Sequence, residues 1–210
     1  MENNTVKQTN PNFGFQRLRP VIGYCENRNT DSPHKIMAEE YKKFIHNSGP
    51  YYLFITITFG RSTGNDARFQ FANRFLDRYN QKLFHRNYKK RGEYLKGFAF
   101  LENHRSCELA DRFHIHFLIK DNDRYRDFDY GQHDEIFKKA AKGVLNGRDK
   151  EVFNMKCINL QEVYKDDGAI GYCMKAIWDK NITNIKTVGV DGLSDKEFKN
   201  SVIASYLRKC

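Results

Sequence analysis

The sequence lacks the cysteine pattern of a disulfide framework or of a structural zinc site. Its five cysteines, an odd number, form no Cys-x-x-Cys pair (Cys25, Cys107, Cys157, Cys173 and Cys210). Reduced thiols in a cytosol-like compartment fit this pattern best. The chain also lacks any apolar run of about 18 residues, the length that a membrane span needs. Residues 1–20 lack the apolar stretch of a signal peptide. We therefore expect a cytoplasmic protein with no membrane segment.

Positive charge exceeds negative charge in this chain of 210 residues. Lysine and arginine total 36 against 26 for aspartate and glutamate, which gives a formal charge of +10. This sign favours a polyanionic partner, because phosphate backbones release counterions when cationic side chains bind. Charge alone leaves two interpretations open, a nucleic-acid-binding protein or a basic protein that is simply soluble. Apolar residues make up 40% of the chain, enough for a folded core.

The hydrophobic pattern predicts an α+β fold with a ferredoxin-like split β-α-β arrangement. Residues 51–180 would form the domain, between an N-terminal extension (1–50) and a C-terminal tail (181–210) with one further helix packed on the domain. Helices would cover one face of an antiparallel sheet and leave the other face for a metal and DNA site. The expected strands are 51–59, 94–102, 112–120 and 152–163, and the expected helices are 38–45, 66–88, 132–145, 168–179 and 195–209.

Two histidines share one face of the strand predicted over residues 112–120. Side chains alternate along a strand, so the apolar residues at odd positions from Phe113 to Ile119 form one face. His114 and His116 then point together to the opposite face, with α-carbons about 6.6–7 Å apart. Two imidazoles at that spacing can converge on one metal ion. The alternative is two ordinary exposed histidines in a sheet.

The preceding strand offers a candidate for a third metal donor. Phe98, Phe100 and Glu102 share one face of it, and Glu102 stands at the strand end beside the hairpin. If that face also carries the two histidines, the three polar side chains form a two-histidine, one-carboxylate site suited to Mg²⁺ or Mn²⁺. Phe98 and Phe100 would then lie outward on the open face. His104 and Glu108, in the connection, are competing third ligands.

A tyrosine and a lysine share one face of the helix predicted over residues 168–179. Tyr172 and Lys175 are three positions apart, and apolar residues at helical spacing occupy another face. Taken alone, this pattern also fits an amphipathic helix with a half-buried tyrosine. Cys173, next to Tyr172, fits a small packing residue.

Together these segments resemble the HUH endonuclease family, which includes rolling-circle replication initiators, relaxases and transposases. The sequence Phe-Ile-Thr-Ile-Thr-Phe-Gly (54–60) is similar to the family's first motif. His114-Ile-His116 is similar to its His-hydrophobic-His motif, and Tyr172-Cys-Met-Lys175 to its tyrosine motif. The order and spacing of the motifs agree over residues 51–178.

Two departures narrow the resemblance. Ala176 stands where initiators with two tyrosines have the second one, so the chain resembles the single-tyrosine type. The sequence has no Walker-type phosphate-binding loop, so a helicase would have to be a separate protein.

The resemblance implies a sequence-specific, single-stranded DNA nickase that initiates rolling-circle replication. Mg²⁺ or Mn²⁺ held by Glu102, His114 and His116 would polarise the scissile phosphate. Tyr172 would attack, leaving a 5′-phosphotyrosine link and a free 3′-hydroxyl, and the reverse reaction would rejoin strands. Lys175 would contact the phosphate or ease loss of the tyrosine proton. The expected partners are single-stranded DNA at a replication origin and the host's helicase and polymerase.

Other side chains are candidates for DNA contact. Thr56 and Thr58 share the histidine face and could touch the strand, although threonine is also simply common in strands. A basic cluster would bind phosphates, together with the basic residues of 17–43. Its members are Arg86, Lys89, Lys90 and Arg91.

Two rival classes of protein share these features. A non-catalytic basic module could grip single strands by stacking bases on Phe98 and Phe100, with no role for metal. A metallo-phosphoesterase acting on nucleotides would turn over without a protein–DNA adduct. A relaxase or transposase of the same superfamily is a further alternative.

Overall fold

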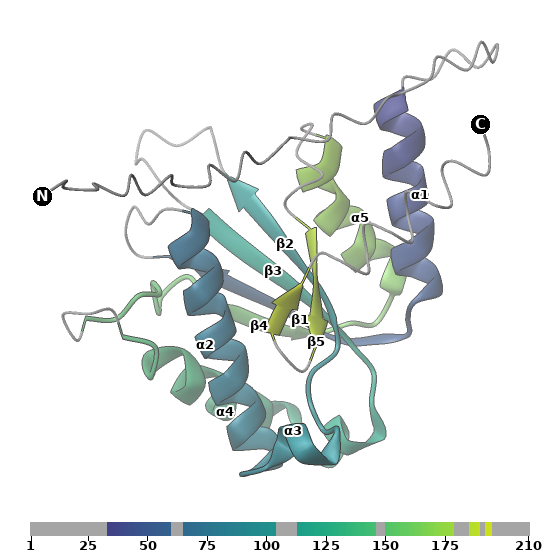
Figure 1. Cartoon of the computed structure of the whole chain (residues 1–210). Coiled ribbons are helices and arrows are strands. Elements are labelled where there is room, and N and C mark those ends of the chain that lie inside the picture. Colours follow the sequence, from purple (N-terminus) through teal and green to yellow (C-terminus); the bar gives the residue numbers. More distant parts are fainter. Residues whose placement is uncertain are drawn as a thin grey trace, which may run out of the picture.

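The central element of the fold is an antiparallel sheet. The computed structural model describes residues 33–59, 65–103, 113–145, 150–178, 185–189 and 192–194. Within them the strands pair in the order β4-β1-β3-β2-β5-β6 (Figure 1). The strands are β1 (Tyr51–Thr58), β2 (Gly97–Asn103), β3 (Phe113–Lys120), β4 (Asn159–Glu162), β5 (Ile185–Gly189) and β6 (Gly192–Ser194). This confirms the predicted α+β class.

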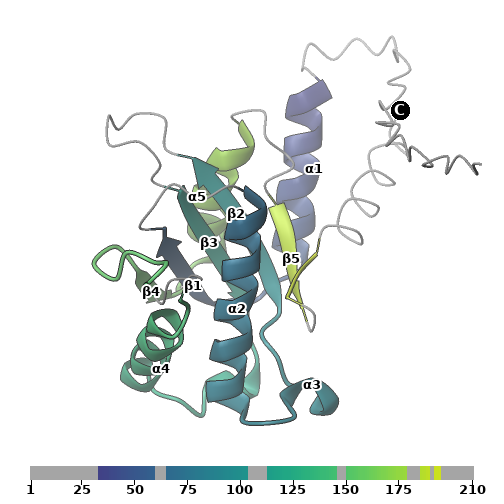
Figure 2. The ribbon, with the colours of Figure 1, turned by 60° about the vertical axis from the view of Figure 1, so that its left-hand side comes forward.

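Helices cover both faces of the sheet. They are α1 (Pro33–Asn47), α2 (Asn65–Phe84), the short α3 (Tyr88–Arg91), α4 (Tyr130–Lys142) and α5 (Asp166–Trp178), with one 3-10 turn at Asp123–Tyr125. Helices α2 and α4 pack together on one face, and α1 and α5 pack together on the other (Figures 1 and 2). The prediction that helices cover a single face is therefore wrong.

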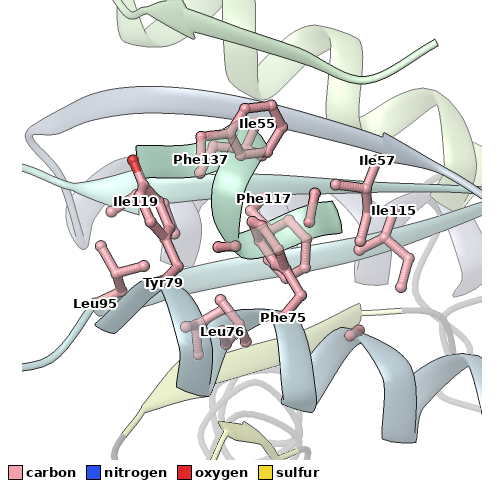
Figure 3. Packing of buried hydrophobic residues seen from close by; sticks show 14 of the residues in the cluster. Ile55, Ile57, Phe75, Leu76, Tyr79, Leu95, Ile115, Phe117, Ile119 and Phe137 are labelled. Carbon is pink, nitrogen blue, oxygen red and sulfur yellow. The ribbon is translucent and has the colours of Figure 1, made fainter. Parts of the chain in front are cut away.

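The larger core lies between the sheet and the pair α2 and α4. Alternation along β1 buries Leu53, Ile55 and Ile57 completely on this side, as expected for a strand with one face toward the core. Phe75 of α2 lies among Phe117 of β3 and other aromatic rings (Figure 3). Helix α4 begins with a capping box at Asp129, which satisfies backbone N–H groups at its first turn.

A second core lies on the histidine face, between the sheet and the pair α1 and α5. Phe98 and Phe100 of β2 are 2% and 0% exposed and pack there with apolar side chains of both helices. The prediction that these two rings point outward is therefore wrong. The two phenylalanines do lie on the same face as the histidines, as predicted. Helices α1 and α5, however, cover the part of that face that carries Phe98 and Phe100.

Segments on either side of residues 51–180 belong to the same folded unit. Helix α1 packs on α5, and β5 pairs with β2 from Gly97↔Val188 to Phe100↔Ile185. The helix expected over 195–209 lies outside the described residues. In the part of the chain that is described, no helix is long and apolar enough to cross a membrane.

Candidate functional site

The two histidines lie on the central strand of the sheet, at the end that α1 leaves uncovered. Register pairs Thr58 with His114 and Thr56 with His116 across β1 and β3. On the other side, Glu102 of β2 lies opposite His114. The side chains of all five residues therefore project from the same face, because partners directly opposite in an antiparallel pair share a face.

Threonine hydroxyls hold both imidazoles from the side of β1. Thr56 Oγ1 lies 2.9 Å from His116 Nδ1, and Thr58 Oγ1 lies 2.9 Å from His114 Nδ1. The hydroxyl of Thr58 also donates to the backbone carbonyl of Cys157, 2.8 Å away. Thr58 is 1% exposed, so its contact with His114 is shielded from solvent. The two rings lie parallel, with centroids 6.1 Å apart.

Glu102 reaches the more buried of the two histidines. Its Oε2 lies 2.8 Å from Nε2 of His116, whose side chain is 4% exposed. A carboxylate oxygen only accepts hydrogen bonds, so His116 Nε2 carries the hydrogen in this contact. The side chain of Glu102 is 20% exposed and thus remains accessible from solvent.

Tyr172 of α5 stands over this group of polar side chains. Its ring meets the imidazole of His116 edge-on, with centroids 5.2 Å apart, and meets Phe54 in the same way at 5.8 Å. Phe54 in turn stacks on His116 at 5.4 Å. Tyr172 is 41% exposed. Burial, followed by the electrostatic influence of Glu102 and of Cys173, raises the pKa of the Tyr172 phenol above its ordinary value.

Cys173, next to Tyr172, is a packing residue in the second core. It is 1% exposed, and burial raises the pKa of its thiol. Lys175 follows Tyr172 by one helical turn in α5, but its side chain lies outside the described part of the structure. The competing ligands His104 and Glu108 also lie outside the described residues.

A cavity of about 700 Å³ opens beside Tyr172 and the histidines. The predicted residues that line it are Thr56, Thr58, His114, His116 and Tyr172. Further lining residues come from β4 and the turn before α5, and the sequence patterns did not single them out as a site: Asn159, Gln161, Glu162, Tyr164 and Lys165. Among them, Tyr164 is 87% exposed. The available signal was the pair of polar side chains at 159 and 161, which alternate with Leu160 in β4 and therefore share one face of the strand.

The basic cluster lies at the other end of the sheet. Helix α3, which carries Lys89 and Arg91, precedes the first residue of β2, whereas Glu102 is near its last. Lys89 pairs with Asp77 at 3.4 Å and Arg91 with Glu93 at 2.7 Å. The structure therefore does not bring this cluster, which includes exposed Arg86 and Lys90, to the histidines.

The donor atoms beside Tyr172 suit a hard divalent cation in their chemistry, since they comprise a carboxylate and two imidazoles. Among the described residues, no group of three His, Cys, Asp or Glu side chains is arranged to hold an ion. The two imidazole rings are parallel, with centroids 6.1 Å apart, and both Nδ1 atoms point toward β1. The two Nε2 atoms are therefore separated by a similar distance. Two ligand atoms on one Mg²⁺ ion lie at most about 4.2 Å apart. One ring must therefore tilt before both histidines can bind the same ion.

Comparisons with protein-family models, with curated proteins and with solved structures each found no match. The function proposed below rests on the geometry of the described residues and on the motif resemblance.

Proposed function

We propose that the protein is a metal-dependent endonuclease that nicks single-stranded DNA with Tyr172 as the nucleophile and so initiates rolling-circle replication. The observation that carries this proposal is the position of Tyr172 over His116, with ring centroids 5.2 Å apart. The same histidine lies 2.8 Å from Glu102. A half-exposed phenol and two imidazoles thus line one cavity, and a carboxylate contacts one of the imidazoles.

The order of the strands supports the same class of protein. In the sequence β4-β1-β3-β2, every neighbouring pair is antiparallel. This order supports a split β-α-β arrangement, in which α2 and α4 would be the two crossover helices. Because a fold hosts many functions, it supports the resemblance without deciding the chemistry.

The proposed reaction is a transesterification. The phenolic oxygen of Tyr172 forms a bond to phosphorus while the bond from phosphorus to the 3′ oxygen breaks. The phenolic proton passes to solvent, and the departing 3′ oxygen takes up a proton to become a hydroxyl. The products are a 5′-phosphotyrosine link and a 3′-hydroxyl that can prime a polymerase.

The residues around Tyr172 have separate tasks in this proposal. Glu102, His114 and His116 would hold Mg²⁺ or Mn²⁺, which supplies Lewis-acid polarisation of the phosphate and offsets the charge of Glu102. That charge contributes to the raised pKa of the Tyr172 phenol, so its neutralisation favours the attacking phenolate. Phe54 fixes the tyrosine ring from the side, and Lys175 would serve the phosphate or the phenol by its positive charge.

The cavity beside Tyr172 is the proposed binding place for the DNA strand. The cavity extends along β4, where Asn159 and Gln161 offer amide groups and exposed Tyr164 offers a ring on which a base can stack. Thr56 lines the same space. The proposed partners are single-stranded DNA at a replication origin and the host's helicase and polymerase, with the formal charge of +10 favouring phosphate binding.

The alternative of a non-catalytic binding module relied on Phe98 and Phe100 as exposed stacking surfaces. Phe98 and Phe100 are buried beneath α1 and α5 and offer no stacking surface. A metallo-phosphoesterase and the non-catalytic module remain as outcomes of the experiment that follows.

The test uses single-stranded oligonucleotides with randomised central sequences and different dyes at their two ends. They are incubated with the protein, with and without Mn²⁺, and separated under denaturing conditions. We expect the 3′ dye to migrate with the protein, and the released 5′-dye fragment to be extendable by a polymerase. Tyr172→Phe should form no adduct, whereas Tyr164→Phe, the matched control in the same cavity, should form it.

Each other outcome overturns the proposal in a distinct way. Cleavage without an adduct indicates a phosphoesterase in which Tyr172 has no chemical role. DNA binding without cleavage, independent of metal and across the whole pool, indicates a binding module. An adduct formed by Tyr172→Phe moves the nucleophile to another tyrosine, with Tyr164 and Tyr130 next in line.

A further inference from the structure

Thr58 links His114 to the main chain of a neighbouring turn. Its Oγ1 lies 2.9 Å from His114 Nδ1 and 2.8 Å from the carbonyl oxygen of Cys157. A hydroxyl carries one hydrogen, and a carbonyl oxygen only accepts. The hydrogen of Thr58 is therefore donated to Cys157, and Thr58 can only accept from His114. Nδ1 of His114 must carry a hydrogen.

We propose that Thr58 is a positioning residue that holds His114 as the Nδ1–H tautomer, with the lone pair on Nε2. Imidazole binds a metal through a nitrogen that has a lone pair, and the partner of the other nitrogen decides which one that is. His114 lines the cavity beside Tyr172. The inference rests on the proposed function for its purpose, whereas the tautomer itself is a property of the protein without metal or DNA.

The second histidine is held in the opposite way. His116 Nδ1 faces the hydroxyl of Thr56, but its Nε2 faces the carboxylate of Glu102, which only accepts. Nε2 of His116 therefore carries a hydrogen where Nε2 of His114 carries a lone pair. The two histidines are not equivalent, and His114 is the one preset to bind a cation.

The surroundings of Thr58 hold this arrangement in place. Thr58 is 1% exposed, so water does not compete for its hydroxyl. The backbone of the turn that offers the Cys157 carbonyl is also fixed to β1, because Asn154 N donates to Thr58 O at 2.8 Å. Cys157 N in turn donates to Asn154 O at 2.9 Å. The acceptor that orients the hydroxyl is thus held by two further hydrogen bonds.

The experiment is ¹⁵N NMR of the imidazole nitrogens in the metal-free, DNA-free protein at alkaline pH, where histidines are neutral. Long-range proton–nitrogen correlations distinguish a nitrogen that bears hydrogen from one with a lone pair. Loss of a signal set in His114→Gln assigns His114. We expect Nδ1 of His114 to bear the hydrogen in the wild type and in Thr58→Ser. In the isosteric Thr58→Val the preference should be lost, and Thr56→Val should leave His114 unchanged.

A binding measurement adds a readout on the proposed cation. By calorimetry, Mn²⁺ affinity should fall about 10–100-fold in Thr58→Val and be restored in Thr58→Ser. The proposal is overturned if wild-type His114 bears its hydrogen on Nε2, or if Thr58→Val keeps the Nδ1–H tautomer. The wild-type spectrum decides the first point even if Thr58→Val does not fold. Because that spectrum needs no DNA, a protein with the expected tautomer but no nicking activity would contradict only the proposed function.

Discussion

Glu102 Oε2 lies 2.8 Å from His116 Nε2, although the residue opposite Glu102 in the ladder is His114. The carboxylate thus reaches diagonally across the face, a distance that long side chains span readily. It satisfies the buried imidazole, and it also keeps a negative charge beside Tyr172. Removal of that charge should therefore weaken cation binding and lower the pKa of the Tyr172 phenol.

Glu102→Gln tests the carboxylate as a metal ligand. The change keeps the shape and removes the charge, so we expect weaker Mg²⁺ or Mn²⁺ binding and cleavage that recovers in part as metal concentration rises. Glu102→Ala should be worse. Glu162→Gln, which removes a carboxylate that lines the cavity beside Tyr172, is the matched control and should behave like wild type. A metal titration shifted by His104→Ala but not by Glu102→Gln would place the third ligand in the connection before β3.

Tyr172→Phe should abolish cleavage and leave DNA affinity within about twofold of wild type, since only one oxygen is removed and phenylalanine keeps the ring contacts. Cleavage is measured on denaturing gels and affinity by fluorescence anisotropy. Tyr164→Phe should keep cleavage. A large loss of affinity in Tyr172→Phe would show that the phenol binds DNA rather than attacking it.

The two histidines should differ in their effect on stability. Strand parity alone predicts little loss for either, because neither side chain points into the core between the sheet and α2. His116 is nevertheless 3% exposed and stacks on Phe54, so His116→Ala should lower the free energy of unfolding by roughly 1–3 kcal/mol. His114→Ala should cost less. Urea denaturation measures both, and equal losses would contradict the difference in burial.

His133 should make stability depend on pH. It is 0% exposed, and burial lowers the pKa of its imidazole. Its Nε2 lies 2.8 Å from the Tyr125 carbonyl, and its Nδ1 lies 3.3 Å from the hydroxyl of Tyr79. The unfolded chain, with an ordinary histidine pKa of about 6.5, binds the proton more readily than the fold. Stability should therefore fall as pH drops below that value toward the folded pKa.

The matched pair of variants for this prediction is His133→Gln and His85→Asn. The urea midpoint of unfolding is measured across the acidic range. Its dependence on pH should become weaker in His133→Gln. It should stay as in wild type in His85→Asn, because His85 is exposed. An unchanged slope in His133→Gln would mean that other groups cause the acid sensitivity.

Much of the main sheet could be predicted because alternation is a local signal. In β1, Leu53, Ile55 and Ile57 are all fully buried, and the pairing of β2 with β3 put Glu102 on the histidine side as strand parity requires. Strands β5 and β6 were missed because Ile-Lys-Thr-Val-Gly and Gly-Leu-Ser show no strict alternation of apolar and polar residues. Pairing with β2, rather than local sequence, defines β5.

The covering of the histidine face could not be predicted from single segments. His114, His116, Phe98 and Phe100 share that face, and only the tertiary position of α1 decides that the phenylalanines are buried while the polar end faces a cavity. The hydrogen bonds of the Thr56 and Thr58 hydroxyls could not be predicted from the sequence either. They depend on the register of β1 against β3, with an irregularity between Tyr51 and Leu53.

Helix α5, which carries Tyr172, packs against α1, so the last helix of the described residues contacts the first. Ala38, Tyr41 and Ile45 of α1 pack in one cluster with Ile170 and Met174 of α5. During synthesis α1 leaves the ribosome early and must wait for nearly the whole domain before its partner emerges. Contacts so distant in sequence form late and slow folding. A translation product truncated before α5 would therefore carry both histidines but lack Tyr172, so under the proposed function it could not cut DNA.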